Sequence, residues 1–186
     1  MKGFLVSLFV ISSAFAAKPK PWIYFDLGDT IVDTSDMSKI KYFQGAKEYL
    51  EGLRDLGINV AIMTNIPVSW GNSQGEKLQS LKVFISQRWV DSVPFDWSIF
   101  QQVLLPETQA EMKPGEGMYL KALARGAPCP IGFVSENVKE VTVAYNLGFA
   151  AHLFVNDVKR YKPLDEIVDF LKNDFQGNWD PECFDD

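Results

Sequence analysis

The feature that most constrains the fold is the alternation, along the chain, of short apolar runs with longer segments of helical periodicity. Apolar runs of roughly four to eight residues have the length of buried strands, whereas apolar residues spaced three and four positions apart mark one face of a helix. Parallel strands need a crossover connection, and a helix usually supplies it. The sequence therefore predicts an α/β protein whose parallel sheet is covered by helices.

The pattern places five strands and five helices along the chain. The strands are expected at residues 22–27, 59–63, 98–105, 131–134 and 150–155. The helices are expected at residues 45–57, 116–124, 137–147 and 164–171, with one more carrying Leu78, Leu81, Phe84 and Ile85 on its inner face. A chain of 186 residues has the length of one ordinary domain.

The first 16 residues have the composition of a secretory signal peptide, with Lys2 at a basic start, an apolar stretch, and small residues at Ala14 and Ala16. An uncleaved membrane anchor is the alternative, but the apolar run is shorter than the ~20 residues of a spanning helix. We expect residues 1–16 to be removed and the protein to be secreted or periplasmic, without a stable membrane anchor. Residues 17–175 then form the domain, and residues 176–186 an acidic C-terminal tail.

Charge and the few histidines and cysteines exclude several classes of function. The formal charge is −6, and removal of residues 1–16 takes away Lys2 and no acid, which gives −7. An acidic protein is not expected to bind nucleic acid. His152 is the only histidine and lies in an apolar run, where a strand residue is expected, so neither a Ser-His-Asp triad nor a multi-histidine zinc site is expected.

Cys129 and Cys183 are the only cysteines. In an oxidising compartment they can form a disulfide that ties the tail to the domain, and two free thiols are the alternative.

Polar residues follow several of the predicted strands. Asp26 follows the first strand, Thr64 and Asn65 the second, and Glu136 the fourth, while Lys113 precedes a helix. Ligands of open parallel sheets bind outside the carboxyl ends of the strands. Acids gathered there repel one another unless a cation lies among them, which indicates a divalent metal, and a lysine suits a phosphate.

Four stretches, FDLGDT, IMTN, KPGEGMY and SENVKEV, resemble in this order the four motifs of the haloacid dehalogenase superfamily of phosphohydrolases. The resemblance spans about residues 21–155. It implies a Rossmann-like three-layer sandwich with a five-stranded parallel sheet of order 5-4-1-2-3. The connection at residues 30–45 is short, and residues 64–113 are taken up by one helix, one strand and two loops, so no cap domain is expected.

The resemblance also implies roles for individual residues. Asp26 corresponds to the nucleophile that forms an aspartyl-phosphate. Thr64, with the backbone at Asn65, would hold the phosphate oxygens, and Lys113 would neutralise the charge shared by Asp26 and the phosphoryl group.

A metal site is implied as well. Glu136 would bind Mg²⁺ together with Asp26 and the carbonyl of Gly28, while Glu140 would support the metal through water or hold Lys113. Oxygen ligands suit Mg²⁺ rather than zinc.

The sequence departs from the family pattern at the position two residues after Asp26. The phosphatases usually carry an aspartate there as general acid and base, a function worth roughly 10²–10⁴ in rate, and this chain has Gly28. We expect Gly28 to leave room for a sharp turn and for close approach of a metal or phosphate. Asp29 either substitutes as the proton donor or caps the turn. Glu136 and Glu140 stand where the family has aspartates.

Two functions remain open on the sequence. The first is an exported Mg²⁺-dependent phosphohydrolase that acts on a phosphorylated substrate. The second is a binding or scaffold protein that keeps the fold and has lost the chemistry, which Gly28 and the two glutamates favour. Trp70 would either line the mouth of the site or pack on the body.

Overall fold

The structure, a computed structural model, describes residues 18–155 and 161–184. The predicted signal peptide, residues 1–16, lies outside the described residues. Among the helices of the two described ranges, none has the length and apolar character that crossing a bilayer requires.

The centre of the fold is a five-stranded sheet in which every pair of neighbours is parallel. Its strands are β1 (Trp22–Phe25), β4 (Asn59–Met63), β5 (Gln102–Leu104), β6 (Ile131–Ser135) and β7 (Ala150–Leu153), in the order β5-β4-β1-β6-β7. When these five strands are numbered 1 to 5 along the chain, the order is 3-2-1-4-5. The predicted order, 5-4-1-2-3, is the same arrangement viewed from the opposite edge. The central strand β1 is fully buried, as its apolar run predicts.

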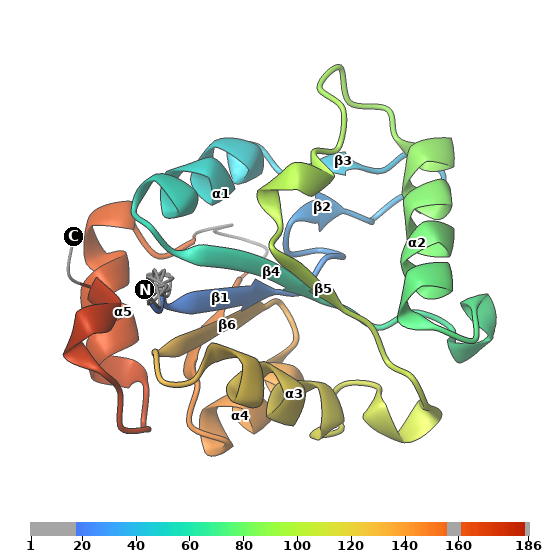
Figure 1. Ribbon diagram of the computed structural model, residues 1–186. Helices are drawn as coiled ribbons and strands as arrows, with labels where there is room; N and C mark the ends of the chain where they lie inside the picture. The colour runs from blue at the N-terminus through green and yellow to red at the C-terminus, as the bar shows by residue number, and fades with distance from the viewer. Residues whose placement is uncertain (1–17, 156–160, 185–186) are drawn as a thin grey trace, which may run out of the picture.

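The part of the chain that the structure describes has five α-helices around the sheet: α1 (Ala46–Asp55), α2 (Gln74–Arg88), α3 (Gly117–Gly126), α4 (Val138–Asn146) and α5 (Ile167–Asp174). Alternate residues of β1 point to opposite faces, as the period of a strand requires. Ile23 and Phe25 join a core with residues of α1, α2 and α5, whereas Trp22 and Tyr24 join a second core with residues of α3 and α4. Figure 1 shows α1 on one side of the sheet and α3 and α4 on the other.

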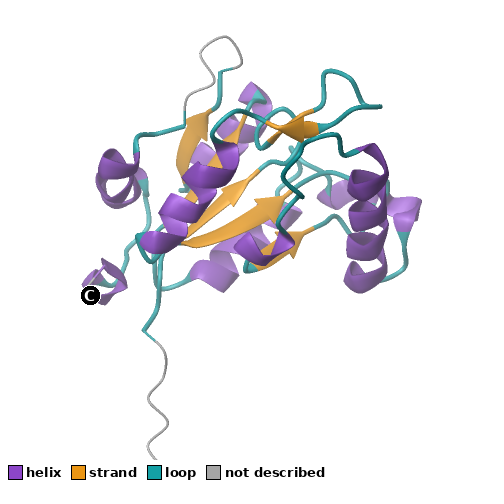
Figure 2. Cartoon of the chain, turned by 90° about the horizontal axis from the view of Figure 1, so that it is seen from above, coloured by secondary structure: helices purple, strands orange, loops and turns teal. Residues whose placement is uncertain are grey.

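The predicted three-layer sandwich is therefore confirmed, and Figure 2 shows, from above, helices in front of and behind the same strands. His152 lies in β7, as expected, and its ring packs edge-on against Phe170.

A small two-stranded sheet was not predicted. Strands β2 (Val32–Asp33) and β3 (Lys41–Tyr42) pair antiparallel in the connection between β1 and α1. Strands of two residues are too short to show a period of two in the sequence. This hairpin, residues 32–42, forms a flap beside the sheet, and in the part of the chain that the structure describes no cap domain is inserted.

The predicted third strand, residues 98–105, is shorter than expected. The Asp96 carboxylate accepts hydrogen bonds from the Ser98 N–H at 2.9 Å and the Ser98 hydroxyl at 2.6 Å, and Trp97–Ile99 form a single 3₁₀ turn. Only Gln102–Leu104 join the sheet, because the local capping by Asp96 competes with extended backbone.

The two cysteines form a disulfide, with 5.6 Å between the Cα atoms of Cys129 and Cys183. Both side chains are buried. The bond ties a 3₁₀ turn at Pro181–Phe184 to the loop between α3 and β6, and the ring of Phe184 packs against Trp179. The alternative of two free thiols is therefore excluded.

Candidate functional site

The site lies at the carboxyl ends of β1, β4 and β6. Asp26 directly follows β1, and its N–H donates to the carbonyl of Val134 in β6 at 2.8 Å. The sheet pairing thus continues to Asp26, so the backbone that carries this side chain is fixed although β1 has ended. The Asp26 residue is only 8% exposed.

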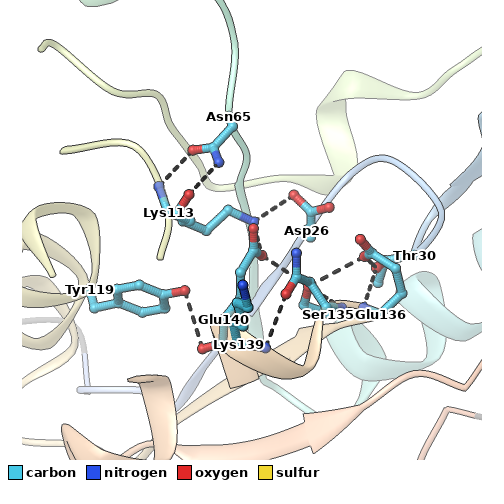
Figure 3. Close-up of polar contacts among 10 residues, drawn as sticks. Asp26, Thr30, Asn65, Lys113, Tyr119, Ser135, Glu136, Lys139 and Glu140 are labelled. Atoms are coloured by element: carbon cyan, nitrogen blue, oxygen red, sulfur yellow. Dashed lines mark hydrogen bonds and ion pairs between the residues drawn. The ribbon is translucent and has the colours of Figure 1, made fainter. Parts of the chain in front are cut away.

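A buried lysine links two carboxylates at this edge. The Lys113 Nζ lies 2.7 Å from Asp26 Oδ1 and 2.6 Å from Glu140 Oε2. Only 1% of the Lys113 side chain is exposed. Figure 3 shows Lys113 reaching between the two acids, which come from the end of β1 and the first turn of α4. Of the two roles expected for Glu140, support of the metal through water and contact with Lys113, the structure shows the contact with Lys113, which also pairs with Asp26.

Asn65 positions the lysine from the end of β4. Its Nδ2 donates to the Lys113 carbonyl and its Oδ1 accepts from the Lys113 N–H, both at 2.8 Å. Two parallel hydrogen bonds fix the backbone from which the lysine side chain extends. The sequence predicted a role only for the Asn65 backbone, and no pattern links residues 48 positions apart.

Glu136 is held by two hydroxyl groups that the sequence reasoning missed. The Thr30 hydroxyl donates to Glu136 Oε2 at 2.7 Å and accepts from the Glu136 N–H at 3.1 Å. The Ser135 hydroxyl lies 3.0 Å from Glu140 Oε2 and 3.3 Å from Glu136 Oε2 (Figure 3). Thr30 and Ser135 are both fully buried. Thr30 belongs to the FDLGDT stretch and Ser135 to the SENVKEV stretch, and this place within the motifs is the signal that could have identified them.

Burial and mutual repulsion shift the titration of this cluster. Burial raises the pKa of Glu136, and the negative charge of Asp26 raises it further. Burial also raises the pKa of Glu140, more than the neighbouring Lys113 lowers it. Burial alone would lower the pKa of Lys113, but Asp26 and Glu140 outweigh it, so the ammonium form is retained. Two acids pair with Lys113, and the third, Glu136, is repelled by the charges of both, so an additional cation would be stabilised here.

The donor set is compatible with Mg²⁺. Within residues 18–155 and 161–184, no three His, Cys, Asp or Glu side chains form a ready-made metal site. Mg²⁺ does not need one, since it keeps several waters and typically binds through one or two carboxylates plus phosphate oxygens. Lys113 pairs with one oxygen of Asp26 and one oxygen of Glu140, so this ion pair does not distinguish the two acids as ligands. Asp26 and Glu136 remain the carboxylates predicted to bind the metal. The Gly28 carbonyl remains a predicted ligand.

The turn after β1 differs from the expectation at Gly28. The residue in the left-handed region is Asp29, with φ of 51°, so the turn does not require glycine at position 28. The Asp29 Oδ1 accepts from the Thr34 N–H at 3.0 Å. Of the two alternatives for Asp29, the structure shows the turn-capping interaction.

A pocket of about 420 Å³ adjoins this turn. Gly28, Thr64 and Asn65 line it on the side of the site, and the side chain of Trp70, which packs against Phe84, lines it farther out. Thr64, predicted to hold phosphate, is buried, and its N–H donates to Leu104 at 3.2 Å. The pocket therefore begins where a phosphate group is expected.

No protein-family model and no curated protein sequence matches this chain. Several solved structures do resemble it. A hydrolase of the haloacid dehalogenase superfamily from Ehrlichia chaffeensis has 16% identity and a TM-score of 0.55, covering 84% of this chain and 98% of its own. An uncharacterized protein from Listeria monocytogenes serotype 4b has 14% identity and a TM-score of 0.56, covering 77% and 83%.

A third structure is the D,D-heptose 1,7-bisphosphate phosphatase from B. bronchiseptica, complexed with magnesium and phosphate. It has 16% identity and a TM-score of 0.51, covering 75% of this chain and 84% of its own. At these identities the likeness shows a shared fold.

Proposed function

We propose that this chain, which has the fold of the haloacid dehalogenase superfamily hydrolases, is a phosphohydrolase that cleaves a phosphomonoester through an aspartyl-phosphate on Asp26. The observation that carries the proposal is the buried Lys113 between Asp26 and Glu140 at the end of the central strand. A carboxylate fixed beside a buried ammonium group is placed to accept a phosphoryl group whose negative charge the ammonium offsets.

The reaction has two steps. Lys113 holds Asp26 Oδ1, so attack on phosphorus by the other carboxylate oxygen keeps the ion pair intact. The bond from phosphorus to the ester oxygen breaks, and the leaving oxygen takes the electron pair and a proton from solvent. Water then attacks phosphorus, the phosphorus bond to Asp26 breaks, and inorganic phosphate and the free carboxylate are released.

The remaining residues would bind and orient the phosphoryl group. The Thr64 hydroxyl and the Asn65 N–H are the expected donors to its oxygens, and Asn65 also keeps Lys113 in position. Asp26, Glu136 and the Gly28 carbonyl would hold Mg²⁺, which would neutralise charge on the phosphoryl oxygens. A structural neighbour with this fold is complexed with magnesium and phosphate, and this supports the assignment.

Export is part of the proposal. It rests on the sequence of residues 1–16 and on the Cys129–Cys183 disulfide, which suits an oxidising compartment.

Hydrolysis of an aryl phosphate with Mg²⁺ tests the proposal. Asp26→Asn should abolish turnover, because an amide is not a nucleophile for phosphorus. Asp36→Asn, at an exposed residue of the flap, is the matched control and should retain turnover. Omission of Mg²⁺ should lower the rate as well. Absence of turnover over a broad panel of phosphate esters would contradict the proposal.

The second candidate, a binding or scaffold protein, is favoured by one observation. Gly28 offers no acidic side chain, and Asp29 is engaged in its turn. This candidate predicts binding of beryllofluoride and Mg²⁺ by calorimetry without hydrolysis of any ester. Binding together with hydrolysis that depends on Asp26 would exclude it.

A further inference from the structure

The pocket beside the site has the size of a small-molecule site and opens onto the phosphate-binding side. Its volume of about 420 Å³ lies within the roughly 300–1,000 Å³ of typical ligand pockets. One end of the pocket is formed by Gly28, Thr64 and Asn65. Gly28 lies two residues after Asp26, while Thr64 and Asn65 follow β4, which is the neighbour of β1 in the sheet. A group esterified to a phosphate at the site would therefore enter this pocket.

The wall of the pocket is apolar on three sides. The flap contributes Val32 and Ile40, and α2 contributes Leu81, Phe84 and Ile85. Ile66 and Trp70 extend the wall from the loop after β4. Among the described residues that line the pocket, none has a charged side chain. A leaving group that carries charge or many hydroxyl groups would lose hydration here without gaining matching partners.

The chemistry at position 28 gives an independent argument. Gly28 has no side chain and the Asp29 carboxylate caps its turn, so neither is placed to donate a proton to the leaving oxygen. Phenols have a pKa of about 10, as tyrosine does, whereas water has about 15.7 and simple alcohols resemble water. A phenolate therefore departs without a proton far more readily than an alkoxide.

We infer that the substrate is an aryl phosphomonoester with an uncharged leaving group of one or two rings, seated in this pocket; the inference rests on the proposed phosphohydrolase activity. The overall reaction is aryl phosphate plus water to phenol plus inorganic phosphate. The bond from phosphorus to the aryl oxygen breaks, the phenolate oxygen keeps the electron pair, and solvent later protonates it. Trp70, which is partly exposed, is placed to stack on the ring.

The test compares kcat/KM for several esters. The kcat/KM for phenyl and 1-naphthyl phosphate should exceed that for glycerol 3-phosphate and glucose 6-phosphate by at least about tenfold. The reason is that loss of a proton donor typically lowers the rate by about 10²–10⁴, and only the alkyl esters need that donor. The ester 2-naphthylmethyl phosphate separates the two arguments, because it is apolar but releases an alkoxide. It should bind with the KM of the aryl esters and turn over with a lower kcat.

Variants of the pocket provide the second arm. Two variants remove side chains that line the pocket, Trp70→Ala and Met37→Gln, and Met37 is 52% exposed. Each should raise KM for 1-naphthyl phosphate by about fivefold. The matched controls are Tyr145→Ala and Leu120→Gln, which are exposed and do not line the pocket. Binding of 1-naphthol, measured by calorimetry, should weaken in the pocket variants only.

The outcomes separate this inference from the proposed function. Equal kcat/KM for aryl and polar alkyl esters, with Asp26→Asn inactive, would overturn the inference and leave the phosphohydrolase intact. Unchanged naphthol binding and KM in both pocket variants would also overturn it. Failure to hydrolyse any ester would remove the proposed function, and the inference with it.

Discussion

At the scale of single residues, the buried ion cluster around Lys113 is the feature with the largest expected effect. Lys113 is 5% exposed, Glu140 6% and Asp26 8%, so none of these charges is well hydrated. A buried ion pair is weak evidence for net stability, but removal of one partner leaves the other charge buried and unpaired. The cluster should therefore be much more sensitive to removal of the lysine than an exposed ion pair is.

The first prediction concerns this asymmetry. Lys113→Met should lower the free energy of unfolding by about 3–5 kcal/mol, because Asp26 and Glu140 lose their cation. Addition of Glu140→Gln to that variant should recover part of the loss, since one buried charge disappears. Urea denaturation measures both. Lys121→Met is the control, because Lys121 pairs with Glu107 and Glu111 at the surface and should contribute under about 1 kcal/mol.

The second prediction concerns a variant that has an aspartate at position 28, where the family's phosphatases usually carry one. A Cβ atom at Gly28 would lie 3.5 Å from the Thr34 Oγ1, an ordinary contact, so Gly28→Asp should fold. It should raise kcat for alkyl phosphates by about tenfold or more, because a proton donor assists departure of an alkoxide. The gain for aryl phosphates should be smaller. Gly28→Asn, which has nearly the same shape and no acid, is the control, and an equal gain in it would contradict the explanation.

At the scale of elements, helix α2 is stabilised by its N-cap as well as by its apolar face. The Ser73 hydroxyl accepts from the Glu76 N–H at 3.2 Å, while Glu76 Oε2 accepts from the Asn72 N–H at 2.7 Å. Caps of this kind satisfy backbone donors that the first turn leaves open. Because α2 supplies Leu81 and Ile85 to the core and the pocket, its cap contributes to both.

The third prediction follows from this cap. Ser73→Ala should destabilise the protein by about 1 kcal/mol in urea denaturation. Ser86→Ala on the same helix is the control and should have less effect, because Ser86 is exposed and lies in the last turn, not at the N-terminus. Equal effects of the two variants would show that the cap is not the cause.

The fourth prediction concerns the flap strand β3. Burial raises the pKa of Tyr42 to about 12, and its hydroxyl accepts from the Asp96 N–H. Because the pKa of Tyr42 is higher in the folded state than in the unfolded state, the protonated hydroxyl contributes to stability. That contribution is fully present below pH ~10 and is lost as the pH rises through the folded pKa. Tyr42→Phe should therefore flatten the fall in unfolding free energy between pH 9.5 and pH 12, measured by urea denaturation. An unchanged slope would contradict this account.

At the scale of the whole molecule, the disulfide joins the C-terminal segment to the loop between α3 and β6. Its two cysteines are 54 positions apart, so the loop it closes includes β6, α4, β7 and α5. In the chain-entropy account, closure of a loop of this length restricts the unfolded chain by about 4 kcal/mol.

The fifth prediction is that the double variant Cys129→Ala/Cys183→Ala loses about 4 kcal/mol of unfolding free energy. Neither cysteine lines the pocket, so kcat/KM of the folded variant should change little. Reduction of the wild-type protein should reproduce the loss in urea denaturation. Equal stability of the oxidised and reduced protein would contradict the prediction.

Much of the site could be predicted because its residues follow strands. A polar residue directly after a buried parallel strand, such as Asp26 or Thr64, must lie at one edge of the sheet. Thr30 and the Asn65 side chain were missed, since their hydrogen bonds to Glu136 and Lys113 join segments 106 and 48 positions apart. The hairpin β2-β3 was missed for a different reason: two-residue strands carry too little periodicity.

The sequence by itself determined the α/β class and the edge at which the polar residues gather, because burial imposes periods of two and 3.6 that can be read along the chain. The strand order came only from the resemblance of its motifs to a known family. Only the tertiary structure decided which groups pair within that edge: that Lys113 lies between Asp26 and Glu140, that Asp29 caps its turn, and that Cys129 bonds to Cys183. The physical reason is that a hydrogen bond or ion pair depends on the position of individual atoms to within a few tenths of an ångström. Such positions follow from packing between distant segments, and periodicity carries no information about them.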